Sequence, residues 1–491
     1  MTRLARISVI VACVACVALA TGAHAQGLVI SGASSFRYIE MRPLALDSVP
    51  YAQTDSAWGP YRLTKSSVLA RCTSLDTYCS FFRSANRQGL AAVMQDLDVT
   101  AWGLGEGVSV HAQLRARAAA GAASDLWPQA NQNFDALAAY VDVDRGFGRI
   151  RAGRQWLASS LGVFNFDGLD LVARARPSFT AELYGGAALV EGLNRPLDAD
   201  VLAPVEDLPP TDHAYLVGGS ARYRPSGRGS IAVQYQRAIR ADRAALYSER
   251  IGVSADLTVR AATLSGQLLR DLATGQNNEL SASARVPLTS TIDATILARH
   301  HAPYFDLWTI WGAFSPVGFD EVGGDLHFAG AGGALALATS GSWRSYEDTH
   351  SGLLVTPMRN DGWHVAVNGS ARLTTALRAD VGYRADIGFG ASGANVDAAV
   401  RWTRGGPLML ALRGTAFQTV GEFQVGEGRV FGLGGEGTWD LSPNVRLAAD
   451  AFLYRHSAHD QPQLVDWNQR RLNVRVEWSL GSEPAWGGRI P

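Results

Sequence analysis

Charged side chains recur at alternate positions between residues 109 and 182, and their types suit contact with ionic groups. Alternate positions on an extended chain share one face, so these side chains would line a common wall. An arginine fork binds two oxygens of a carboxylate, sulfate or phosphate at once. We therefore expect a charged wall that can orient ionic solutes. Its predicted members are Arg115, Arg117, Arg149, Arg151, Arg174, Arg176, Asp142, Asp144 and Glu182.

A second interpretation of the same residues stays open, in which the charges pair with one another and only solvate the wall. Asp142 and Asp144 precede a tight turn, and Arg149 and Arg151 follow it, so the acids would face the bases across adjacent strands. No surplus of basic charge is evident over the inward faces. The formal net charge of −1 argues against a general nucleic-acid binder, which would carry a basic excess.

The elements that would position these side chains are β-strands. Apolar and polar residues alternate with a period of two over 108–117, 377–384, 396–403 and 472–480. Such segments have one apolar and one polar wall. Each is about 9–11 residues long, which is enough to cross a bilayer at a tilt.

A membrane barrel explains these strands better than a soluble sandwich does. The polar walls carry repeated Arg, Asp and Glu, which a dry sandwich interior could not hold but a water-filled lumen can. No run past residue 25 is long and apolar enough for a spanning helix. The predicted fold is all-β: a transmembrane antiparallel up-and-down β-barrel of about 22 strands, within a range of roughly 18–24, with no plug domain.

Short and long connections alternate between the predicted strands, as is typical of barrels with tight periplasmic turns and long outer loops. The barrel is predicted over 26–480, with a long outer loop at 42–90 and a C-terminal tail at 481–491. A first strand near Leu28 leaves no room for a folded plug ahead of the barrel. Long connections are predicted at 42–90, 118–132, 156–166, 191–212, 302–318, 347–361 and 456–469.

The N-terminus has the pattern of an export signal. Arg3 and Arg6 precede the apolar run 7–20, and Ala23-His24-Ala25 forms a small-x-small cleavage site. Residues 1–25 are therefore predicted to be a cleaved signal peptide, and the outer membrane of a Gram-negative bacterium is the expected location. Cys72 and Cys79 remain in the mature chain, and an exported pair is expected to form a disulfide.

The loop at 42–90 has two interpretations. It could fold over or into the lumen and narrow it, or it could be an exposed surface loop. A loop of this length usually has a function or lacks order, and a disulfide within it favours order.

One stretch resembles a known family. Gly153-Arg154-Gln155 and Phe166-Asp167-Gly168-Leu169-Asp170-Leu171 resemble the alginate-export and related substrate-specific porin families, in which a Gly-Arg-Gln strand end precedes a loop and a Phe-Asp-Gly strand start. The resemblance covers 134–190. It implies a porin-like barrel with an arginine-lined lumen that passes anionic polysaccharide and with long loops that constrict it. The intervening loop here, 156–165, is shorter than the family pattern.

The leading functional hypothesis is a channel for small polar solutes, including anionic or sugar-acid solutes. The alternative is a structural barrel that sheathes or anchors a periplasmic partner, such as an electron carrier or a polymer-export machine. No catalytic, cofactor or metal motif stands out; His300 and His301 are adjacent, so on a strand they would point to opposite walls. Expected partners are outer-membrane lipid, the barrel-assembly machinery and small solutes, and a homo-oligomer is open.

Overall fold

The computed structural model describes most of the chain. The described residues are 27–41, 44–58, 61–64, 69–72, 77–84, 86–121, 133–189, 214–240, 246–302, 318–347, 361–388, 392–403, 405–422, 426–458 and 467–481. The predicted signal peptide at 1–25 and the tail after residue 481 lie outside them.

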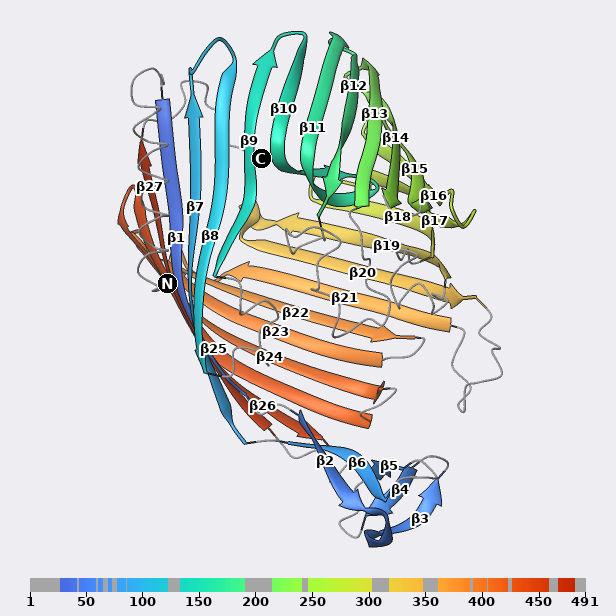
Figure 1. Cartoon of the computed structure of the whole chain (residues 1–491), viewed down its shortest axis with the longest axis vertical. Coiled ribbons are helices and arrows are strands. Elements are labelled where there is room, and N and C mark those ends of the chain that lie inside the picture. The colour runs from blue at the N-terminus through green and yellow to red at the C-terminus, as the bar shows by residue number, and fades with distance from the viewer. Residues whose placement is uncertain are drawn as a thin grey trace.

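Twenty-two antiparallel strands form the main sheet (Figure 1). The first half comprises β1 (Gly27–Met41), β7 (Gln88–Trp102), β8 (Val108–Gly121), β9 (Phe134–Arg145), β10 (Gly148–Ser159), β11 (Gly162–Arg176), β12 (Phe179–Ala188), β13 (Ala214–Ser226), β14 (Gly229–Arg240), β15 (Leu246–Val259) and β16 (Ala262–Asp271). The second half comprises β17 (Asn277–Pro287), β18 (Ile292–His301), β19 (Phe319–Gly330), β20 (Leu335–Tyr346), β21 (Asp361–Arg372), β22 (Leu377–Ile387), β23 (Ser392–Thr403), β24 (Leu408–Glu422), β25 (Gly426–Ser442), β26 (Val445–Ala458) and β27 (Trp467–Gly481).

The first and last strands close the sheet into a barrel. β1 pairs with β7 on one side and with β27 on the other, where the register runs from Val29 opposite Gly481 to Glu40 opposite Arg470. Each remaining strand pairs with its neighbours in sequence, which is up-and-down topology. The predicted fold class and strand number are confirmed. The described residues outside the barrel form one small sheet and no plug domain.

The two faces of the wall have opposite chemistry. Large apolar side chains point outward and stay exposed, for example Ile296 at 67%, Leu412 at 60% and Leu453 at 63%. A monomeric soluble surface rarely exposes a continuous apolar band of this kind. The inward positions carry charged and polar groups, so the apolar band faces lipid and the lumen faces water. The chain is thus a transmembrane β-barrel. Among the described residues, no helix is long and apolar enough to cross a membrane.

The turns at one end of the barrel are short, and two of them share their chemistry. Leu288 N donates to Ile292 O, and Leu373 N donates to Leu377 O in the same way. Thr289 Oγ1 accepts hydrogen bonds from Thr291 N and Ile292 N. A threonine hydroxyl in a turn often binds backbone amides in this way. A Leu-Thr pair thus begins both of these hairpin turns.

One predicted long connection is wrong. The segment 156–166 is not a loop, because β10 continues to Ser159 and β11 begins at Gly162. Only Ser160 and Leu161 join them. The mixture of polar and apolar residues in this segment suggested a loop, but the two strands stay paired to the tip, with Ser159 opposite Gly162.

The long segment between β1 and β7 contains a small sheet of its own. Its strands are β2 (Leu44–Pro50), β3 (Thr54–Trp58), β4 (Tyr61–Thr64), β5 (Leu69–Arg71) and β6 (Tyr78–Ser84), in the order β2-β6-β5-β4-β3. A 3₁₀ turn at Tyr51–Gln53 joins β2 and β3. A disulfide links Cys72 and Cys79, and both cysteines pack with the fully buried Ala70. Figure 1 shows this sheet beyond the rim of the barrel.

Candidate functional site

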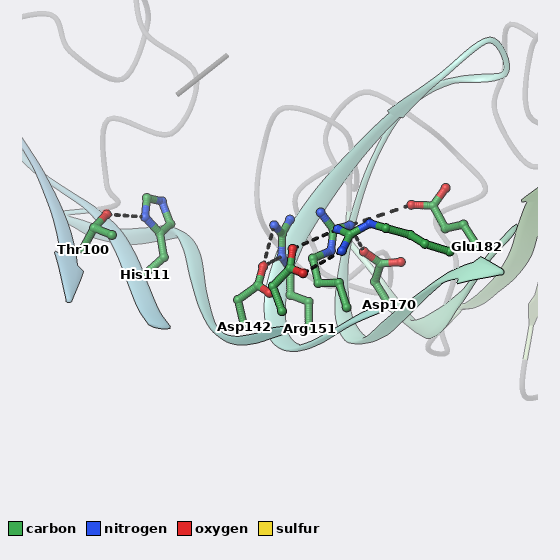
Figure 2. A network of polar contacts seen from close by, with 9 residues as sticks. Thr100, His111, Asp142, Arg151, Asp170 and Glu182 are labelled. Carbon is green, nitrogen blue, oxygen red and sulfur yellow. Dashed lines mark hydrogen bonds and ion pairs between the residues drawn. The ribbon is translucent and has the colours of Figure 1, made fainter. Parts of the chain in front are cut away.

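Four neighbouring strands hold a chain of ion pairs on the lumenal wall (Figure 2). Arg151 on β10 donates from Nε and Nη2 to Asp142 Oδ2 on β9, at 3.0 and 2.9 Å. Arg149 donates from Nη2 to Asp170 Oδ2 on β11 at 2.6 Å, and the same nitrogen lies 4.0 Å from Glu182 Oε1 on β12. The register of antiparallel strands produces this array, since Arg151 lies opposite both Asp142 and Asp170.

The other predicted arginines also lie against carboxylates, with one exception. Arg115 contacts Asp96 at 2.6 Å, and Arg117 contacts Asp135 at 3.4 Å. Arg174 binds Asp144 with two nitrogens at 2.6 and 2.9 Å. Arg176 lies exposed at the end of β11, past a shift in register that follows Ala173. The predicted wall thus carries charges of both signs in close pairs.

Aromatic rings extend this polar wall toward β7 and β8. The Arg151 guanidinium lies 4.2 Å from the centre of the Tyr140 ring, and that ring packs 5.0 Å from the His111 ring. His111 Nδ1 is hydrogen-bonded to Thr100 Oγ1 at 2.9 Å. A cation over an aromatic face is attracted by the ring quadrupole, so Tyr140 helps to fix the position of Arg151.

The β10–β11 hairpin leaves the wall and lies across the lumen. Its tip contacts β14, the third strand beyond β11 around the barrel. Ser160 N and Oγ both donate to Gln234 Oε1 on β14, at 2.9 and 2.6 Å. Gln234 alternates with Ile231 and Val233, which are exposed on the lipid side, so it faces the lumen. Figure 1 shows the ends of β10 and β11 turning across the barrel below β12 and β13.

An apolar cluster packs between the hairpin and the neighbouring strands β12 and β13. Phe166 is fully buried and packs 5.8 Å from the Tyr184 ring, with Leu216 completing the contact from β13. Leu157 and Phe164 of the hairpin pack on the same cluster. Burial on this scale is unusual among large side chains of a water-filled lumen, and it stabilises the hairpin through the hydrophobic effect. The hairpin therefore occupies part of the lumen.

A second group of charges lines the facing part of the wall. Glu321 on β19 is ion-paired with two arginines. Its Oε1 lies 3.2 Å from Arg344 Nη2, and its Oε2 lies 3.8 Å from Arg299 Nη1. Both guanidiniums lie over the Phe319 ring, at 5.1 and 5.6 Å from its centre. A hollow of about 1080 Å³ lies along this wall, between β18 and β24. His300 and His301 contact different carboxylates, Asp320 and Glu279.

The hairpin tip and the second charged group were missed by sequence reasoning. Arg299, Glu321 and Arg344 follow the same alternation as the predicted wall, so the period of two was a usable signal for them. Ser160 and Gln234 had no such signal, because their contact joins residues 74 positions apart.

Comparisons with known proteins give distant structural similarities only. No family model and no curated protein matches the chain. A BenF-like porin from Pseudomonas fluorescens Pf-5 is 10% identical, with 92% of this chain and 99% of that chain covered and a TM-score of 0.41. OccAB4 from Acinetobacter baumannii is 8% identical, with 93% and 99% covered and a TM-score of 0.40. OccK2 (OpdF) from Pseudomonas aeruginosa, solved in complex with glucuronate, is 8% identical, with 92% and 98% covered and a TM-score of 0.37.

Proposed function

We propose that this protein is an outer-membrane channel for small polar solutes, including solutes that carry a carboxylate, such as sugar acids. The observation that carries the proposal is the hairpin folded into a closed, charge-lined barrel. A lipid-facing exterior and a water-facing interior make a transmembrane passage, and a hairpin across that passage restricts it to small solutes.

The charge pairs support selection by charge and orientation. Arginine and carboxylate groups at close range set up a local field across the passage, which orients a dipolar or charged solute. A carboxylate on a solute can compete for an arginine, because the guanidinium donates hydrogen bonds to both carboxylate oxygens at once. Arg149 and Arg151 lie beside the hairpin root, where a passing solute would meet them.

The alternative of a sheath around a partner fits less well. The hairpin tip binds the lumenal side of β14, so it occupies space that an enclosed protein would need. The channel is compatible with three further expectations, which form no part of this proposal. They are a periplasmic partner anchored at the end of the barrel with the short turns, assembly by the barrel-assembly machinery, and association into a homo-oligomer.

The test uses the refolded protein in two settings. In planar bilayers, the inserted protein should give stepwise single-channel conductance. Proteoliposomes that contain the protein should swell faster in a sugar acid than in the neutral sugar of the same size. A barrel that inserts but never conducts would contradict the channel. Equal swelling rates for the two sugars would contradict the preference for carboxylates and leave the channel intact.

A further inference from the structure

We propose that Arg154 is a positioning residue that holds the β10–β11 hairpin across the lumen and so sets the width of the passage. This inference rests on the proposed channel function. Arg154 belongs to the face of the hairpin opposite to that of Asp170 and the buried Gln155, so it acts through the hairpin and not by lining the ion-pair chain.

The hairpin separates from both neighbouring strands at one level. Pairing between β9 and β10 runs from Arg145–Gly148 to Ala139–Arg154 and stops there. The ladder between β11 and β12 runs to Phe166 opposite Ala188, and one further backbone hydrogen bond follows it, from Leu189 N to Asn165 O at 2.9 Å. Beyond Asn165, the described ladder pairs of the hairpin join β10 and β11 to each other, which frees the hairpin to bend inward.

A row of glycines marks the bend. Gly153, Gly168 and Gly186 lie side by side on three strands. Gly153 has a φ of +128°, a region that side-chain-bearing residues rarely adopt, and a Cβ there would lie 2.2 Å from the Ala139 carbonyl oxygen. A Cβ on Gly168 would lie 2.1 Å from the Gly185 carbonyl oxygen. The bend therefore needs backbones without side chains at this point.

Arg154 fixes the bend from its other side. Its Nε and Nη2 donate to the two oxygens of Asp167, each at 2.8 Å, across the pair of hairpin strands. Its Nη1 donates to the Ala136 carbonyl oxygen at 3.2 Å, on the part of β9 that β10 has left. One guanidinium thus ties both hairpin strands to the neighbouring wall, which a lysine could not do with the same geometry.

Beside the Phe166 cluster, the hairpin tip has few polar contacts of its own, so Arg154 at the root supplies much of the polar restraint. Both tip hydrogen bonds share the single acceptor Gln234 Oε1. Loss of the Arg154 fork would let the hairpin swing about the glycine row, away from β14 and β15. The passage would then widen even though no residue that lines it had changed.

The experiment compares Arg154→Gln and Asp167→Asn with the wild type in planar bilayers. Either variant should raise single-channel conductance by about twofold, because conductance follows the open cross-section. Arg285→Gln is the matched control, since it removes an arginine paired with Asp293 at 3.1 Å far from the hairpin, and it should leave conductance unchanged. If Arg154→Gln fails to fold, Asp167→Asn removes the same contact and decides the question.

A reversible cross-link separates positioning from a general loss of structure. A Cβ at Gly252 would lie 2.9 Å from Ser160 Oγ, close to the roughly 3 Å between a Cβ and the partner sulfur in a disulfide. Ser160→Cys with Gly252→Cys should therefore pin the tip to β15. In the Arg154→Gln background, oxidation should restore the wild-type conductance and reduction should raise it again. Arg154→Gln without the added cysteines controls for reduction of the native disulfide.

The outcomes are distinct. Unchanged conductance in both Arg154→Gln and Asp167→Asn would overturn the inference while the wild-type channel stands. A rise that the oxidised cross-link does not reverse would also overturn it, because the pore would then respond to lost charge and not to the hairpin. Absence of conductance in every protein, the wild type included, would instead contradict the proposed function.

Discussion

At the scale of single residues, the lumen is organised by charge pairs rather than by free charges. Arg151 and Asp142 have side chains that are 20% and 11% exposed, so each depends on the other for neutralisation. Removal of one partner leaves the other charge partly buried and uncompensated, which costs more than the pair itself contributes.

Arg151→Gln should therefore shift ion selectivity toward cations and lower the free energy of unfolding by at least about 1–3 kcal/mol. The shift is measured as the reversal potential across a salt gradient, and stability as denaturant unfolding in vesicles. Adding Asp142→Asn should recover most of both changes. Equal selectivity in the wild type and Arg151→Gln would mean that this pair does not act on permeating ions.

At the scale of elements, two insertions in the barrel have opposite roles. The β10–β11 hairpin enters the lumen, whereas the sheet β2–β6 lies beyond the rim with its own disulfide-centred core. The sheet thus favours the second interpretation of residues 42–90, an exposed segment, although it is folded and not an irregular loop.

Replacement of residues 44–84 by a short Gly-Ser linker should leave single-channel conductance unchanged. Met41 and Gln88 are partners at the end of the β1–β7 ladder, so a short linker can rejoin them without strain. Deletion of 157–164 is the contrasting variant, and it should raise conductance. A rise after removal of the small sheet would show that it restricts the passage after all.

At the scale of the whole molecule, the stability of the barrel in a membrane depends on which face of each strand contacts lipid. Leu412 on β24 is 60% exposed on the outer face, and Thr415 lies on the alternate, lumenal face of the same strand. An arginine near the middle of the bilayer is costly, whereas an arginine in a water-filled lumen is solvated.

Leu412→Arg should therefore reduce the free energy of unfolding from phospholipid vesicles by about 2–4 kcal/mol, and Thr415→Arg should change it little. Guanidinium titration followed by tryptophan fluorescence measures both. Equal losses in the two variants would contradict the assignment of the faces.

The sequence alone was sufficient for the barrel, for its approximate strand number and for the positions of most turns. Strand segments such as 472–480 repeat a local pattern, and a period of two specifies both walls of a strand wherever it occurs. The paired interpretation of Asp142 with Arg151 was also available, because a tight turn brings residues close in sequence into register.

The tertiary structure decided how the lumen is narrowed. The Gly153-Arg154-Gln155 segment looked like a strand end, yet the strand continues and bends at its glycine toward β14 and β15. That direction depends on contacts between Ser160 and Gln234, on the Phe166 cluster and on the reach of Arg154 to β9. Alternation along a strand reports only which face a side chain occupies, whereas the path of a hairpin depends on packing between strands that are distant in sequence.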